Sequence, residues 1–274
     1  MIEQPEAINY MRQLKGTIMG KRIVHAAAAC SSHKFTWYYG NPQEYNGRLK
    51  KKVVHEALAF GGMVEITAGD SVIVVTDGVG LRYHVNEQNR PQKHQLLIEF
   101  EDGSALSASV QMYGGIWCFH KGEFDSMYYR VAKEKPSPLS KDFNEEYFKG
   151  LLASVDKTKV STKAFLATEQ RIPGLGNGVL QDILWNAELH PRKKVDTLTD
   201  GDIEKLFNAV KGTLSEMAEH GGRDTEKDLF GNKGGYRTIM GKNNDAMICP
   251  HCGGHVRKEN YMGGSIYFCE DCQK

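Results

Sequence analysis

Four cysteines near the end of the chain have the spacing of a metal site. They form two Cys-x-x-Cys pairs separated by sixteen residues, Cys249 with Cys252 and Cys269 with Cys272. Each pair directs two thiolates at one centre, so both pairs together supply the closed tetrahedral set of sulfur ligands that structural zinc prefers. Two disulfides or a redox dithiol are the alternatives. The spacing favours one structural zinc ion.

A glycine-rich turn, IPGLGNGVLQDILWNAELHP, is the second stretch with chemical potential. Gly174 and Gly176 permit positive φ and the close approach of a partner, and Asn177 is placed to cap a helix running toward Ala187. Unpaired amides at such a helix start carry the positive end of the helix dipole, so we expect a phosphate to bind there. A dinucleotide-binding fold fits poorly, because no strand precedes the turn.

The elements that position these residues follow from the patterning of the chain. Residues 3–14 are predicted to form an opening helix with Ile8, Met11 and Leu14 on one face. From Lys21 to about Tyr129, short β-rich runs are punctuated by Asp-Gly pairs that favour hairpin turns, which is typical of an antiparallel sandwich.

The predicted fold class is α+β, with four successive segments. Residues 1–130 form the helix and sandwich, and 131–140, with two prolines, form a linker. Residues 141–222 form a helical domain, in which Thr199 and Asp202 resemble a capping box. Residues 223–274 form a glycine- and lysine-rich loop followed by the cysteine segment.

Composition sets the broad class. Of 274 residues, 40% are hydrophobic and 25% are charged, which is ordinary for a globular protein. The net charge of +1 argues neither for nor against nucleic acid, although residues 157–194 hold seven basic and three acidic side chains. This local excess of positive charge could serve to attract phosphate, or it could simply belong to a helical face that is exposed to solvent. No apolar run approaches membrane-spanning length. Thiols kept for metal predict a reducing compartment, the cytoplasm.

The order of these parts resembles the formamidopyrimidine-DNA glycosylase/endonuclease VIII family. The resemblance implies a helix–two-turn–helix motif and a zinc-finger hairpin, which grip damaged double-stranded DNA while the lesion is flipped out. It also implies a monomer that associates with the nucleoid when bound to DNA. The residues that carry the resemblance are Pro5-Glu6, Lys163, Gly174-Leu-Gly-Asn177, His190-Pro191 and the four cysteines. It implies that Asn177 and Lys163 contact phosphates and that Tyr236 lies near the lesion-covering loop.

The family's chemistry uses the amine of an N-terminal proline, followed directly by glutamate. The amine attacks C1′, expels the base and forms a Schiff base, and β-elimination then cuts the strand. Here Glu3, Pro5 and Glu6 match the pattern in register, but Ile2 occupies the proline position. The free amine is then expected on Met1, about 3.8 Å of Cα spacing further out. The predicted catalytic residues are Met1, Glu3 and Glu6. The two carboxylates also have a structural interpretation, because negative charge in the first turn of a helix is stabilised by the helix dipole.

Other positions depart from the family pattern. Gly62 aligns with an expected lysine, and Gly264, at the finger tip, aligns with an arginine that clamps phosphates. Arg257 and Lys258 are the predicted substitutes for that arginine. The residues that fill the gap left by the flipped base appear as Val79 and the stretch 111–113. In that stretch Met112 and Tyr113 are predicted to wedge between bases, or else to be core strand residues.

The predicted function is therefore a DNA glycosylase with associated lyase activity in base-excision repair. The alternative is a non-catalytic binder of damaged or distorted DNA that has lost the glycosylase chemistry. A third possibility, from another class, is a zinc-ribbon protein associated with RNA or ribosomes, which the predicted sandwich does not particularly suggest.

Overall fold

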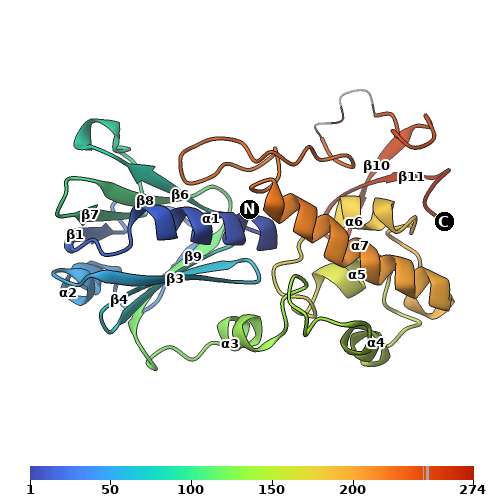
Figure 1. Ribbon diagram of the computed structural model, residues 1–274, viewed down its shortest axis with the longest axis horizontal. Helices are drawn as coiled ribbons and strands as arrows, with labels where there is room; N and C mark the ends of the chain where they lie inside the picture. The colour runs from blue at the N-terminus through green and yellow to red at the C-terminus, as the bar shows by residue number, and fades with distance from the viewer. Residues whose placement is uncertain (243, 245–246) are drawn as a thin grey trace.

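Two lobes make up the molecule, a β-sandwich and a helical lobe. The N-terminal helix α1 (Gln4–Thr17) lies along the sandwich, with its first residues at the junction of the two lobes (Figure 1). The computed structural model describes residues 1–242, 244 and 247–274. Positions 243, 245 and 246 of the loop expected over 223–246 lie outside the described residues. None of the helices in the described part combines the length and the apolar character that a membrane span requires. The α+β class is confirmed.

The sandwich consists of two sheets that face each other across one apolar core. Sheet one has the strand order β1-β7-β8-β6, and sheet two has the order β2-β9-β5-β4-β3. Pairing is antiparallel except between β2 and β9, which run parallel, so the expectation of a wholly antiparallel sandwich is wrong at that edge. The strands of the lobe are β1 (Ile23–Ala28), β2 (Thr36–Tyr38), β3 (Val54–Phe60), β4 (Met63–Ala68), β5 (Ser71–Thr76), β6 (Val79–His84), β7 (Leu96–Phe100), β8 (Ala105–Val110) and β9 (Gly114–His120).

The two Asp-Gly pairs do different work. Asp102-Gly103 turns β7 back onto its neighbour β8 in the same sheet, as predicted, with Gly103 at φ 82°. Asp77-Gly78 instead carries the chain from β5 in one sheet to β6 in the other. A tight turn at a sandwich edge can switch sheets as readily as it can close a hairpin, because its dipeptide does not specify the pairing partner.

Strand β5 is buried on both faces, because the outer face of its sheet is also covered. Helix α3 (Met127–Glu134) packs Ala132 into a second, smaller core with Val72, Val74 and Phe119. The first four residues of the linker expected over 131–140 therefore belong to a helix. Prolines at 136 and 138 follow, since they cannot continue it.

Helix α1 buries a different face from the predicted one. Its buried residues include Glu6, Ala7, Tyr10 and Leu14, whereas Ile8 and Met11 are only partly buried. The periodicity was misleading because α1 packs against both lobes. Its polar side chains are used at the junction, where Asn9 Nδ2 donates to the Gly221 carbonyl at 2.8 Å and Arg12 Nη1 donates to the Ala218 carbonyl at 2.8 Å.

The helical lobe has its own core, built around the phenylalanines Phe143, Phe148, Phe165 and Phe207. The capping box of Thr199 and Asp202 is confirmed at the start of α7. The helices here are α4 (Glu145–Ala153), α5 (Thr162–Ala167), α6 (Leu180–Asn186) and α7 (Asp200–Glu219), with the short turn η3 (Val195–Thr197) before α7. The sandwich lobe contains α2 (Tyr45–Leu49) and the short turns η1 (Pro42–Glu44) and η2 (Glu87–Asn89). A hairpin of β10 (Val256–Tyr261) and β11 (Gly264–Cys269) follows.

The lobes touch through backbone at one pair of glycine turns. Gly174 has φ 77°, and a Cβ built on it would lie 2.2 Å from the Gly61 carbonyl carbon. Gly61, in the turn between β3 and β4, would likewise place a Cβ 2.7 Å from Pro173. No side chain fits at either position without separating the two lobes. Gly174 is therefore required by both its φ angle and the space around it.

We predict that Gly174→Ala lowers the free energy of unfolding by about 3 kcal/mol, the sum of left-handed strain and overpacking. Urea unfolding followed by circular dichroism measures the change. The matched control is Gly150→Ala, inside α4, where a Cβ meets nothing within 4 Å. In that variant the free energy of unfolding should rise by about 0.5–1 kcal/mol, because alanine is the better helix former. If both variants changed the free energy of unfolding by the same amount, the close backbone contact between the Gly174 and Gly61 turns would be contradicted.

Candidate functional site

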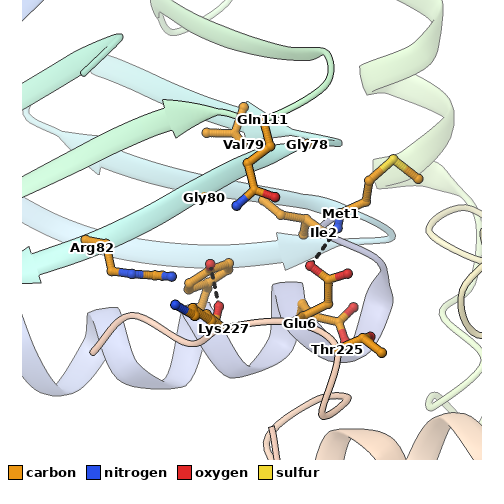
Figure 2. A pocket seen from close by; sticks show the side chains of 12 residues that line it. Met1, Ile2, Glu6, Gly78, Val79, Gly80, Arg82, Gln111, Thr225 and Lys227 are labelled. Carbon is orange, nitrogen blue, oxygen red and sulfur yellow. Dashed lines mark hydrogen bonds and ion pairs between the residues drawn. The ribbon is translucent and has the colours of Figure 1, made fainter. Parts of the chain in front are cut away.

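A pocket of about 130 Å³ opens beside the first residues of the chain, between the sandwich and the loop that follows α7 (Figure 2). Met1 and Ile2 form one side, and Gly78, Val79 and Gly80 at the start of β6 form another. The remaining walls come from α1, from β6, from the residue that follows β8 and from the loop after α7. They include Glu6, Tyr10, Arg82, Gln111, Thr225, Glu226 and Lys227.

The N-terminal amine lies in this pocket and has a defined partner. Met1 N donates to Glu226 Oε2 at 2.7 Å, and the side chains of the two residues remain about one-third exposed, at 32% and 28%. The next amide, Ile2 N, donates to the Asp77 carbonyl at 2.5 Å and fixes the chain end against the sandwich. Sequence reasoning missed Glu226, because nothing in the sequence connects residue 226 with residue 1.

Glu3 points away from the pocket and binds the glycine-rich turn. Its carboxylate accepts the Gly178 amide at 2.9 Å and the Val179 amide at 2.7 Å. These are the amides at which a phosphate was expected, so that expectation is wrong for this turn: the anion there is a side chain of the protein itself. A Cβ on Gly178 would lie 1.6 Å from Arg223 Nη1, which explains the glycine at that position.

Glu6 and Arg223 form a buried ion pair behind the pocket. Arg223 Nε donates to Glu6 Oε1 at 2.9 Å and Nη2 donates to Oε2 at 2.8 Å, and both residues are at most 5% exposed. Arg223 Nη1 also lies 3.4 Å from Glu3 Oε2. Two carboxylates thus share one guanidinium, and Glu6 has the better geometry.

The pKa values of the two glutamates move in opposite directions. Burial raises the pKa of Glu3, and the Arg223 charge and the two turn amides offset this only in part. Burial also acts to raise the pKa of Glu6, but the charge and hydrogen bonds of Arg223 outweigh it, so the pKa is lowered. Burial lowers the pKa of Arg223, but Glu3 and Glu6 outweigh it and raise it. Glu6 is therefore held ionised at neutral pH.

Asn177 and Lys163 come together at the hairpin rather than at an open helix end. Helix α6 starts at Leu180 with Val179 as its N-cap, so the predicted capping by Asn177 is wrong. Asn177 Nδ2 donates instead to the Ser265 carbonyl at 3.0 Å, and Lys163 Nζ donates to the Tyr261 carbonyl at 2.6 Å. The turn and the hairpin therefore form one continuous surface.

The other predicted DNA contacts are spread over the molecule. Arg257 pairs with Glu270 at 2.7 Å, and Lys258 lies over the Tyr267 ring, both exposed on β10. Met112 and Tyr113 are 62% and 36% exposed between β8 and β9, so neither is a core strand residue.

Three other positions are closed to solvent or crowded. Tyr236 is 5% exposed in the core of the helical lobe, which argues against a DNA contact through its side chain. Val79 is 1% exposed, although it lines the pocket. A Cβ on Gly62 would lie 2.9 Å from the Ile2 carbonyl oxygen, so the position that aligns with a lysine is crowded by the chain end.

The four cysteines converge as predicted. Their Sγ atoms all lie within 4.8 Å of one another, with Cys249 and Cys272 at 3.8 Å and Cys252 and Cys269 at 3.4 Å. Four sulfurs at about 2.3 Å from a tetrahedral zinc would be about 3.8 Å apart, so the cluster fits that ion. Trp185 Nε1 donates to Cys249 Sγ at 3.3 Å and ties the cluster to α6.

We predict that Glu6→Gln lowers the free energy of unfolding by about 3 kcal/mol at pH 7, because Arg223 loses its buried partner. The folded pKa of Glu6 is below its unfolded value, so this stabilisation exists above the unfolded pKa and is lost as the pH falls through the folded pKa. Urea unfolding of both proteins at pH 7 and at progressively lower pH should show the difference shrinking. A difference independent of pH would contradict an ionised Glu6.

Known proteins share this architecture. A family model described as the formamidopyrimidine-DNA glycosylase H2TH domain matches residues 135–228. The chain is 28% identical over 289 residues to formamidopyrimidine-DNA glycosylase of Lactobacillus delbrueckii subsp. bulgaricus, covering 100% of both chains. It is 27% identical over 282 residues to the protein of that name from Brevibacillus brevis, covering 100% of this chain and 99% of the relative.

The fold is also that of solved proteins. A crystal structure of Lactococcus lactis Fpg in complex with DNA containing an abasic site matches with a TM-score of 0.80 at 22% identity, over 99% of each chain. The chain is therefore similar to formamidopyrimidine-DNA glycosylases in its H2TH domain, along its whole length and in its fold.

Proposed function

We propose that this protein is a DNA glycosylase of base-excision repair with associated lyase activity on abasic sites. The observation that carries the proposal is the placement of the Met1 amine in a pocket between the sandwich and the loop after α7, next to a carboxylate. The names of the relatives support the same activity, and the neighbouring Fpg structures contain damaged or abasic-site DNA.

Met1 supplies the nucleophile in this proposal. The neutral amine attacks C1′ of the damaged nucleoside, and the bond to the base breaks with its electron pair leaving on the base. The attached amine loses a proton, and the C1′–O4′ bond then breaks with its electron pair leaving on O4′, which takes up a proton. The nitrogen lone pair forms the C1′=N bond of the protonated Schiff base. Removal of a C2′ proton then expels the 3′ phosphate.

Glu226 is the proposed acceptor of the amine's protons. Its carboxylate lies 2.7 Å from Met1 N, within the reach that general base catalysis needs, and its partial exposure lets it exchange protons with water. Glu3 and Glu6, which were expected to move these protons, have other hydrogen-bond partners. Glu6 lines the pocket but is bound by Arg223, and Glu3 faces the turn. We assign Glu3 and Glu6 as positioning residues.

The grip on DNA is divided between the hairpin and the sandwich. Asn177 and Lys163 hold the hairpin against the turn, and the exposed Arg257 and Lys258 on it supply cations for phosphate oxygens. On the sandwich side, Met112 and Tyr113 extend from the loop between β8 and β9 and are the proposed wedge between bases. We propose that the protein acts as a monomer on double-stranded DNA, in the cytoplasm.

One structural zinc ion completes the proposal. Cys249, Cys252, Cys269 and Cys272 would hold it, and it would stabilise a two-stranded hairpin too small for a core of its own. The ion takes no part in the bond-breaking steps.

We predict that borohydride traps wild-type protein on a duplex with an abasic site and that the modified peptide contains Met1. Glu226→Gln should slow trapping about 100-fold, because general base assistance is lost, with DNA affinity changed less than twofold. Gel analysis and peptide mass spectrometry measure both. The matched control is Glu219→Gln, an exposed carboxylate on α7, which should trap at the wild-type rate.

Each other outcome has a definite meaning. An adduct on an internal lysine would contradict Met1 as the nucleophile. Binding without any adduct would favour the non-catalytic binder of damaged DNA. Failure to bind any damaged duplex would refute the proposed function itself.

We predict one zinc per chain, measured by elemental analysis, and its loss in Cys252→Ser. That variant should lose DNA affinity at least tenfold, because the hairpin no longer holds its shape, while the sandwich stays folded. The control is Cys30→Ser, an exposed thiol outside the cluster, which should retain the metal. Iron in place of zinc, or full metal content in Cys252→Ser, would contradict the assignment.

A further inference from the structure

An exposed row of aromatic side chains runs from β2 toward the chain's N-terminus, and neither the pocket nor the proposed wedge accounts for all of it. Trp37 is 50% exposed, Tyr113 is 36% exposed and Tyr128 is 41% exposed. The Trp37 and Tyr113 ring centroids are 5.8 Å apart at an interplanar angle of 43°. Neighbouring exposed rings, unlike apolar residues scattered singly over a surface, mark a binding site.

The row is continuous with the proposed catalytic site. The Tyr128 hydroxyl donates to Asp77 Oδ1 at 3.3 Å, and the carbonyl of Asp77 accepts the Ile2 amide. The Gly78 amide donates to the Tyr113 carbonyl at 2.9 Å, and both Gly78 and Gln111 line the pocket. The rings therefore stand at the edge of the cavity that holds Met1.

The backbone holds the outer part of this row rigidly. Trp37 pairs in register with Gly115 through the parallel contact of β2 with β9, and the Gly114 amide donates to the Phe35 carbonyl at 3.0 Å. Strand β2 is only three residues long and contributes little to the sandwich core. Its pairing thus serves to present Trp37 beside Tyr113.

The charges around the row favour an uncharged, flat occupant. The Asp77 carboxylate lies at its inner end, near enough that burial and this charge raise the pKa of Tyr113. A phosphate would be repelled there. A nucleobase is neutral, planar and able to stack on any of these rings, at about 1–3 kcal/mol per base.

We propose that Trp37, with Tyr113 beside it, is a stacking site for an unpaired nucleobase next to the damaged position. When a nucleotide leaves the helix, its neighbours lose a stacking partner, and the Trp37 ring replaces it. The inference rests on the proposed function and adds a contact on β2, outside the wedge between β8 and β9.

The experiment compares Trp37→Ala and Trp37→Phe with wild type on two duplexes, one undamaged and one carrying a tetrahydrofuran abasic analogue. Trp37→Ala should weaken binding of the abasic duplex about tenfold and of the undamaged duplex much less, because only the former has an unstacked base. Trp37→Phe should restore most of the affinity. Val85→Ala, which removes another exposed apolar side chain, should bind as wild type.

Tryptophan fluorescence gives a second readout of stacking. Trp37 is half exposed, whereas Trp117 packs against Phe124 and Trp185 donates a hydrogen bond to Cys249. Stacking should quench wild-type emission on binding the abasic duplex, and Trp37→Phe should bind without that quenching.

Two results would overturn the stacking site while leaving the proposed function intact: abasic-duplex binding by Trp37→Ala within twofold of wild type, or equal weakening on both duplexes. Wild-type protein that binds neither duplex would instead refute the proposed function.

Discussion

The buried ion pair between Arg223 and Glu6, extended to Glu3, is the interaction on which the rest of the structure depends. It joins three parts of the chain that are far apart in sequence: the first helical turn, the glycine-rich turn and the loop after α7. Removing charges from water is costly unless each is paired. These segments therefore hold one another in place, and none keeps its position when another moves.

This network also decides which groups remain free for chemistry. Arg223 Nη2 donates to the Met1 carbonyl at 3.3 Å, so the guanidinium orients the chain end as well as the carboxylates. With Glu3 and Glu6 engaged, Glu226, on the same loop as Arg223, is the acid that meets the amine. In the proposed mechanism, the buried Glu3 and Glu6 hold the structure together, and the partly exposed Glu226 accepts protons.

The fold was largely predictable from the sequence, and the site only in part. The cysteine spacing and the Thr199–Asp202 capping box depend on nearby residues, so local pattern was sufficient for both. Asp77-Gly78 and the face of α1 were misjudged because tertiary packing decides them. The contacts of Glu226 and Arg223 with the N-terminus span more than 200 positions of sequence, and no local signal encodes such pairings. Asn177 has the residue type of a helix cap, but the hairpin is the stronger partner.

The crowding between Gly62 and the carbonyl of Ile2 restricts the path of the chain end. A lysine introduced at position 62 would collide with the present chain end, and the backbone of Gly174 is also only 3.5 Å from its Cβ. A side chain at position 62 is incompatible with the present path of the first residues. Gly62→Lys must therefore displace the first residues of the chain, and with them the Met1 amine.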